Sequence, residues 1–114
     1  IIVSETTRQA VPGYVYRKLD LVRVKGKEEP IAIYEPVSTE DEISEAETNE
    51  LQTWEDFLEH YINQDWNQAE TLLETLVQLS PDRKVYSVYA ERVRNFRDNP
   101  PGPDWDGVYT HTTK

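Results

Sequence analysis

The sequence predicts an α+β protein in which a small sheet with one short helix precedes a unit of three helices. Near the N-terminus apolar and polar residues alternate with a period of two, as in strands with one buried face. Later apolar residues recur with the helical period of about 3.6 residues. We divide the chain into residues 1–37, an acidic linker at 38–49, a helical unit at 50–99 and a C-terminal tail at 100–114.

The first elements are a short strand and a short helix. Residues 1–3 are Ile-Ile-Val, whose β-branched side chains predict a buried strand cut from a larger sheet. Ser4 is a favourable helix N-cap, and Glu5 places a negative charge in the first turn. This helix can run to about Val11, and Pro12-Gly13 should end it.

A β-hairpin should follow. Residues 14–24 alternate as a strand does, with one irregularity near Asp20 and Leu21 that predicts a β-bulge. Residues 25–30 contain Gly26 and Pro30 and form the turn, and residues 31–37 form the second strand.

The linker at residues 38–49 is dominated by carboxylates and has few apolar side chains. Its acidic residues are Glu40, Asp41, Glu42, Glu45 and Glu47. A solvated connector is favoured over an acidic docking segment, because charge runs of this kind are usually solvated.

Three amphipathic helices are expected after the linker. Thr53 can cap the first and Asp65 the second, while Ser80 with Pro81 is a typical start for the third. Their apolar stripes comprise Trp54, Phe57, Leu58, Tyr61 and Ile62; Trp66, Ala69, Leu72, Leu73, Leu76 and Leu79; and Val85, Tyr86, Tyr89, Val93 and Phe96.

The three tryptophans are candidates for structural or interaction roles. Trp54 and Trp66 fall on helix stripes and are expected in the core. Trp105 follows a proline-rich segment that should be extended. It either folds back onto the helices, which is favoured because tryptophan buries a large apolar area, or anchors the tail on another surface.

Composition excludes several classes of function. The formal net charge of −10 repels phosphates and argues against nucleic acid or an anionic membrane as a partner. The chain has no cysteine, which removes disulfides, thiolate metal sites and cysteine nucleophiles. No apolar run approaches the roughly 20 residues of a membrane span. We expect a cytoplasmic protein, whose parent can be membrane-attached through upstream segments.

Two stretches near the N-terminus carry a recognisable motif. They are Ile1-Ile2-Val3-Ser4-Glu5-x-Thr7 and Leu19-Asp20-x-Val22-Arg23-Val24-Lys25-Gly26-Lys27-x-x-Pro30-Ile31-x-Ile33-Tyr34-Glu35. Residues 1–37 thereby resemble the last segment of the catalytic domain of class III adenylate/guanylate cyclases, and the fold implied for them is part of the cyclase sheet.

The rest of the chain resembles the tail that follows this domain in many bacterial, especially cyanobacterial, cyclases. The tail combines a tetratricopeptide-like helical hairpin, a proline-rich stretch and a terminal W-D-G-V motif, here residues 105–108. Residues at tetratricopeptide-like spacing are Trp66, Ala69, Leu73, Leu76 and Pro81. Phe57 departs from the repeat, which usually has a small residue there, and one repeat alone excludes a solenoid.

The resemblance implies that the parent protein is a homodimeric cyclase that converts ATP to cyclic AMP and pyrophosphate with Mg²⁺ or Mn²⁺. ATP is chosen over GTP on family frequency. In the family, the two metal-binding aspartates, and an Asn and an Arg that stabilise the transition state, lie upstream of the segment matching Ile1. The 114 residues are therefore expected to have no catalytic residue, to bind no metal and to be inactive alone.

The partners implied are the rest of the cyclase domain, a second cyclase chain and, in the parent, ATP. The alternative is a non-catalytic interaction or dimerisation module.

Lys25 and Lys27 are the candidate ligands of the substrate phosphates. Lys25 matches the family's first lysine of K-G-K, which contacts the triphosphate, and Lys27 matches the second basic position. Gly26 between them lets the backbone turn closely. The plain alternative is that both lysines are solvated charges on a hairpin turn beside Glu28 and Glu29.

Two further polar sites suggest only structural roles. Asp56 and His60 lie four residues apart on a predicted helix, and with no third ligand nearby we interpret them as a side-chain pair and not a metal site. His111 has no acid at triad-like spacing and is expected to face solvent.

Overall fold

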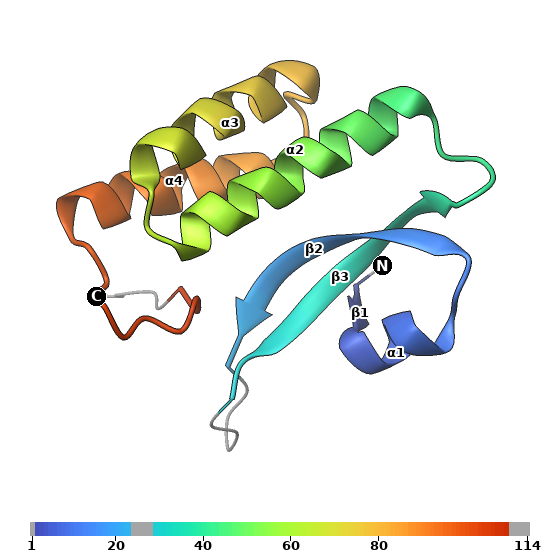
Figure 1. The fold of residues 1–114 in the computed structure, drawn as a ribbon, viewed down its shortest axis with the longest axis horizontal. Coiled ribbons are helices and arrows are strands. Elements are labelled where there is room, and N and C mark those ends of the chain that lie inside the picture. Colours follow the sequence, from blue (N-terminus) through green and yellow to red (C-terminus); the bar gives the residue numbers. More distant parts are fainter. Residues whose placement is uncertain (1, 24–28, 110–114) are drawn as a thin grey trace. The chain divides into compact units, whose positions relative to one another are not determined.

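The computed structural model describes residues 2–23 and 29–109. These residues form an α+β fold with a three-stranded antiparallel sheet and four helices (Figure 1). The chain divides into two compact units. One comprises Ile1–Ser44 with Trp105–Lys114, and the other comprises Glu45–Asp104.

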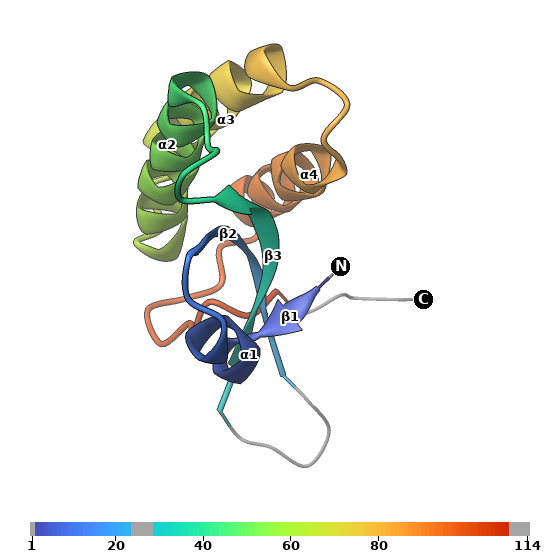
Figure 2. The ribbon, with the colours of Figure 1, turned by 90° about the vertical axis from the view of Figure 1, so that its right-hand side faces the viewer.

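The first unit contains the sheet and the short helix. Its elements are β1 (Val3–Ser4), α1 (Glu5–Ala10), β2 (Tyr14–Val22) and β3 (Ile31–Thr39). The strand order is β1-β3-β2, with both neighbouring pairs antiparallel. Figure 2 shows β1 beside β3, with α1 directly after it.

Helix α1 begins and ends as its sequence predicts. The backbone of Ser4 is extended, and its hydroxyl accepts a hydrogen bond of 3.2 Å from the backbone N–H of Thr7. Val11 is the C-cap, and its N–H donates to the carbonyl of Thr7 at 3.1 Å. Gly13 then takes a φ of 95°, a conformation that glycine adopts without steric cost.

The β2–β3 pair contains two register shifts. Lys18 lies opposite Tyr34 and Asp20 opposite Ile33, so the shift falls at Leu19, next to the predicted bulge. The second shift separates Val15 from Tyr16, and Tyr16 lies opposite Pro36. Proline has no backbone N–H to give to the ladder, which explains an irregularity at this point.

The predicted linker is wrong at both ends. Strand β3 continues to Thr39, and the N–H of Glu40 donates to the carbonyl of Gly13 at 2.8 Å. Helix α2 (Glu45–Ile62) begins inside the acidic stretch and well before Thr53, because Glu45 and Glu47 stabilise the positive end of its dipole. Thr53 is therefore inside the helix, where its hydroxyl donates to the carbonyl of Asn49.

The second unit consists of α2, α3 (Trp66–Leu79) and α4 (Lys84–Asp98). Its core is largely aromatic. Trp54 stacks on Phe57 with ring centroids 5.2 Å apart, and both side chains are fully buried. Trp66 is half-buried at the edge of this core, where it stacks on Phe96 at 5.1 Å.

Helix α3 has the predicted cap, but α4 starts later than predicted. Asp65 accepts a bond from the N–H of Gln68 and caps α3. Ser80 does not cap α4, because it ends α3 and its hydroxyl donates to Glu50 at 2.9 Å. Residues 80–83 form a turn, and α4 starts at Lys84 with no side-chain bond from its N-cap, Arg83.

The C-terminal tail differs from the favoured expectation for Trp105. The tail leaves α4 at Asn99, and the side chain of Gln64 donates to the carbonyl of Gly102 at 2.6 Å. Trp105 then belongs to the unit that contains the sheet and not to the helical unit. Its indole N–H donates to the carbonyl of Val108 at 2.8 Å, so its polar atom is satisfied within the tail.

None of the described helices is both long and apolar enough to cross a lipid bilayer.

Candidate functional site

Lys25 and Lys27, the predicted phosphate ligands, lie outside the described residues, as does His111. The structure does describe the strands on either side of the K-G-K segment. Val22 at the end of β2 lies opposite Ile31 at the start of β3, so the strands that flank this segment are paired up to its two ends. The assignment of Lys25 and Lys27 to phosphate binding stays a prediction.

The terminal W-D-G-V motif lies beside the end of β2. Arg23 forms an ion pair with Asp106, and the other carboxylate oxygen of Asp106 accepts a 3.0 Å bond from the N–H of Val108. Together with the bond between Trp105 and Val108, this folds the motif into a local turn that holds Asp106 against Arg23. Sequence reasoning missed the contact, because no local pattern links two charges so far apart in the chain.

A buried ion pair crosses the two long strands. Arg17 on β2 lies opposite Glu35 on β3, and their side chains are 2.6 Å apart. The side chain of Arg17 is only 3% exposed. The alternation of β2 predicts no buried charge at this position. The only available signal was the opposite charge of Glu35 in a strand expected to pair with it.

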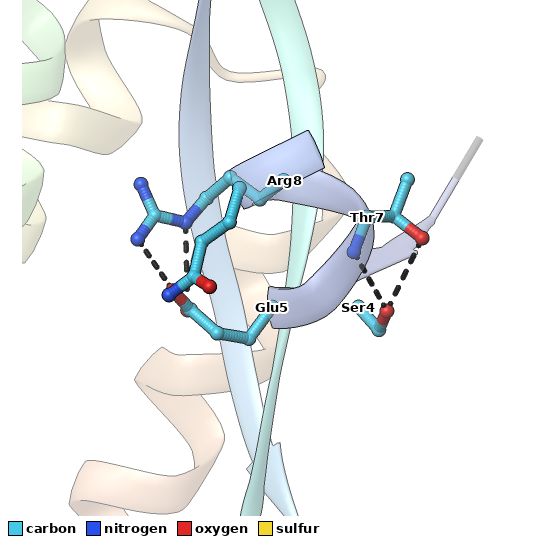
Figure 3. A network of polar contacts seen from close by, with 5 residues as sticks. Ser4, Glu5, Thr7 and Arg8 are labelled. Atoms are coloured by element: carbon cyan, nitrogen blue, oxygen red, sulfur yellow. Dashed lines mark hydrogen bonds and ion pairs between the residues drawn. The ribbon is translucent and has the colours of Figure 1, made fainter. Parts of the chain in front are cut away.

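A second polar network lies on α1, where Figure 3 shows Glu5 and Arg8 in contact, and it reaches Tyr34 of β3. The guanidinium of Arg8 donates to Glu5 at 2.6 Å, and the amide of Gln9 donates to the same carboxylate at 2.8 Å. The Arg8 guanidinium also lies 4.8 Å from the ring centroid of Tyr34, in cation–π geometry. The network fixes one face of α1 on the strand that contains Tyr34.

The pKa values of this network follow from its hydrogen bonds. The bonds from Arg8, and then the bond with Tyr34, lower the pKa of Glu5 from 4.5 to about 2. The hydrogen bond to Glu5 raises the pKa of Arg8 above its usual value. Burial, followed by the bond with Glu5, raises the pKa of Tyr34. The carboxylate is thus kept ionised and the phenol protonated over the whole neutral range.

In the helical unit, Glu50 connects α2 to the turn between α3 and α4. Its carboxylate accepts bonds from the Tyr86 hydroxyl at 2.6 Å and the Ser80 hydroxyl at 2.9 Å. The Arg83 guanidinium lies 3.6 Å away. These three partners come from α4 or the turn before it, so this carboxylate supports the packing of the helices.

The helical unit also has an open groove between α3 and α4. Its volume is about 330 Å³, and it is lined by Glu70, Leu73, Glu74, Val77, Gln78, Ala90, Val93 and Arg94. Leu73 and Val93 are buried and form the floor, while Val77 remains 37% exposed. The groove thus combines an apolar floor with polar walls.

The described residues offer no cluster of three or more His, Asp or Glu side chains that could hold a metal ion. Asp56 and His60 do not pair with each other as expected. Asp56 accepts a bond from Gln52 at 3.2 Å, whereas Nδ1 of His60 lies 3.1 Å from the carboxylate of Asp65. His60 therefore contacts the cap of α3.

Comparison with known proteins adds no relative. The chain matches no family model, no curated protein and no solved structure.

Proposed function

We propose that residues 1–37 are the C-terminal segment of the catalytic domain of a class III adenylate cyclase. The motif from Leu19 to Glu35 is the observation that carries this proposal. The antiparallel pairing of β2 and β3 supports it, because the pairing puts the K-G-K segment between the ends of two adjoining strands.

In this proposal Lys25 and Lys27 supply positive charge to the triphosphate of ATP in the parent enzyme, where that charge opposes the negative charge developing in the transition state. The remaining chemistry belongs to the rest of the cyclase domain and to a second chain. The 114 residues by themselves bind the nucleotide too weakly to act, because a lysine is a point charge without a phosphate cradle.

We further propose that α2 and α3 form one tetratricopeptide-like hairpin to which α4 is added. Ala69 is fully buried in α3, as a small residue at a close helix contact should be. Phe57, at the position where the repeat has a small residue, is also fully buried and contributes to the aromatic core instead.

A cyclase assay on the full-length protein that contains these residues tests the proposal. With Mn²⁺ and either ATP or GTP, we expect cyclic AMP from ATP, and no product from the 114-residue chain under the same conditions. Absence of any cyclic nucleotide from the full-length protein would contradict the assignment, and turnover by the 114 residues alone would contradict the placement of the catalytic groups upstream.

A second candidate function is a non-catalytic interaction or dimerisation module. The observation that favours it is the open groove between α3 and α4, in which Val77 is 37% exposed beside the buried Leu73 and Val93.

A further inference from the structure

The walls of the α3–α4 groove have opposite charges. Glu74 lies on the α3 wall and Arg94 on the α4 wall. Val77 lines the same groove and is exposed to solvent. Within residues 2–23 and 29–109, neither Glu74 nor Arg94 makes a hydrogen bond or an ion pair. Glu70 differs, because Arg97 donates to it at 2.8 Å. The groove therefore presents one uncompensated acid and one uncompensated base beside an apolar floor.

Such a surface is complementary to itself. In a two-fold contact the same patch is used on both subunits, and when the two-fold axis runs along the groove each wall meets the opposite wall of the other copy. We propose that the α3–α4 groove is the interface of a homodimer in which Glu74 of each copy pairs with Arg94 of the other, and the exposed Val77 packs into the partner's groove. This rests on the second candidate function and is independent of any cyclase activity.

The charges also distinguish a second copy from other occupants. A basic peptide would be attracted by the net charge of −10 but would meet Arg94 in the groove. An acidic peptide would meet Glu74 and the acidic surface of the whole chain. The occupant that fits offers one cation and one anion around an apolar side chain, and this chain presents that combination itself.

Charge reversal provides a sharp test on the 114-residue protein. In Glu74→Arg, both cross-dimer pairs become Arg facing Arg, and in Arg94→Glu both become Glu facing Glu. Each exposed pair contributes little, but reversing two of them together should weaken the dimer Kd at least about tenfold. Sedimentation velocity on a dilution series measures this directly.

Mixing the two variants gives the decisive observation. In a heterodimer of Glu74→Arg with Arg94→Glu, each of the two contacts again joins an arginine to a glutamate. We expect each variant to be monomeric alone, an equimolar mixture to form the heterodimer, and the double variant to recover the wild-type Kd. An interface elsewhere on the protein would leave each single variant with the wild-type Kd, and mixing the two variants would not strengthen dimerisation.

Matched controls separate the local pairs from the overall charge. Glu55→Arg makes the same change in net charge as Glu74→Arg, at an exposed position on α2 outside the groove, and Lys84→Glu makes the same change as Arg94→Glu. Because Glu55→Arg lowers the acidic self-repulsion, it should leave dimerisation unchanged or slightly stronger, whereas Glu74→Arg should weaken it. Circular dichroism verifies that all variants keep their helix content.

Two results would overturn the proposal. A wild-type chain that stays monomeric at high micromolar concentration excludes a second copy as the occupant, while the interaction module could still bind another protein. A wild-type dimer whose Kd is the same in both charge reversals locates the interface elsewhere and leaves the dimerisation module standing. Neither result bears on the cyclase assignment.

Discussion

Arg17 shows how one residue can support the sheet despite a polar side chain. It is almost fully buried, and a guanidinium loses much hydration on burial. The carboxylate of Glu35, 2.6 Å away on the neighbouring strand, compensates part of that loss. Because the two residues lie directly opposite each other, the pair also favours this register over one shifted by a residue.

Glu35→Ala should therefore destabilise the sheet unit. It removes the charge next to a buried cation, and breaking such a pair typically costs about 3 kcal/mol, less here because Glu35 is 29% exposed. Urea unfolding followed by tyrosine fluorescence measures the loss. Glu29→Ala removes an exposed carboxylate just before β3. It is the matched control and should change the free energy of unfolding little. Equal stability of both variants would show that the pair contributes nothing.

Lys25→Ala tests the proposed phosphate contact in the full-length protein. Losing one cation at the triphosphate should lower kcat/KM for ATP by about 10- to 100-fold, which corresponds to roughly 1.4 to 2.8 kcal/mol. The fold should be unchanged, because K-G-K belongs to a predicted turn. Lys18→Ala, on β2, controls for the loss of a positive charge elsewhere in the same unit. Unchanged kinetics would mean that Lys25 is a solvated charge and not a phosphate ligand.

Helix α1 is held by polar contacts and has no buried side chain of its own. Its attachment should therefore depend on pH through Glu5. Because the folded pKa is lowered, the stabilisation from ionised Glu5 is complete above the unfolded value near 4.5 and is lost as the pH falls towards about 2.

An NMR titration of the Glu5 carboxyl tests this, and we expect a midpoint of about 2. In Glu5→Gln the backbone signals of α1 should lose this acid transition, whereas they should keep it in Glu55→Gln, an exposed glutamate on another helix. A midpoint near 4.5 would mean that Arg8 and Tyr34 do not hold the carboxylate in solution.

Helix and strand types could be predicted from the sequence wherever local chemistry decides them. Ser4 and Asp65 cap helices as expected, because an N-cap needs only the residue and the N–H groups that follow it. Ser80 has an equally good cap sequence but donates its hydroxyl to Glu50, which comes from a distant part of the chain. The acidic residues at the start of α2 predict a solvated linker, because charge composition alone does not distinguish a linker from an exposed helical turn.

The candidate sites were less predictable because they depend on long-range placement. The Arg23–Asp106 pair and the opposite charges of the α3–α4 groove join positions that no periodic pattern connects. Lys25 and Lys27 were identified by resemblance, and their role stays a prediction because they lie outside the described residues. The large apolar area of Trp105 favours a position on the helices over anchoring on another surface, but Trp105 belongs to the sheet unit and its indole N–H donates to the carbonyl of Val108.

The acidity of the protein as a whole opposes its self-association. Each copy has a formal net charge of −10, and the repulsion acts over a Debye length of about 10 Å at 0.1 M salt but only about 3 Å at 1 M. Salt also weakens the attraction within the two Glu74–Arg94 pairs of the proposed interface. This loss is smaller than the gain from screening, because the carboxylates in excess far outnumber the two pairs. Salt should therefore strengthen dimerisation.

We expect the dimer Kd to fall several-fold between 50 mM and 1 M NaCl in sedimentation equilibrium. Sodium sulfate would confound the measurement, because it also strengthens apolar burial, so NaCl is the appropriate salt. A Kd that rises steadily with NaCl would show that the attractive pairs dominate, in contradiction to the charge argument.

The membership of Trp105–Lys114 in the sheet unit has a consequence for the order in which the protein forms during synthesis. The helical unit, Glu45–Asp104, is inserted within the chain of the sheet unit, and all of its own residues have been made before residues 105–114 are added. Helical packing between sequence neighbours forms quickly, so the three helices can assemble while the sheet unit is still incomplete. Asp106 can reach Arg23 only after the whole helical unit has been made, and a ribosome that stops before this codon releases a sheet unit without that ion pair.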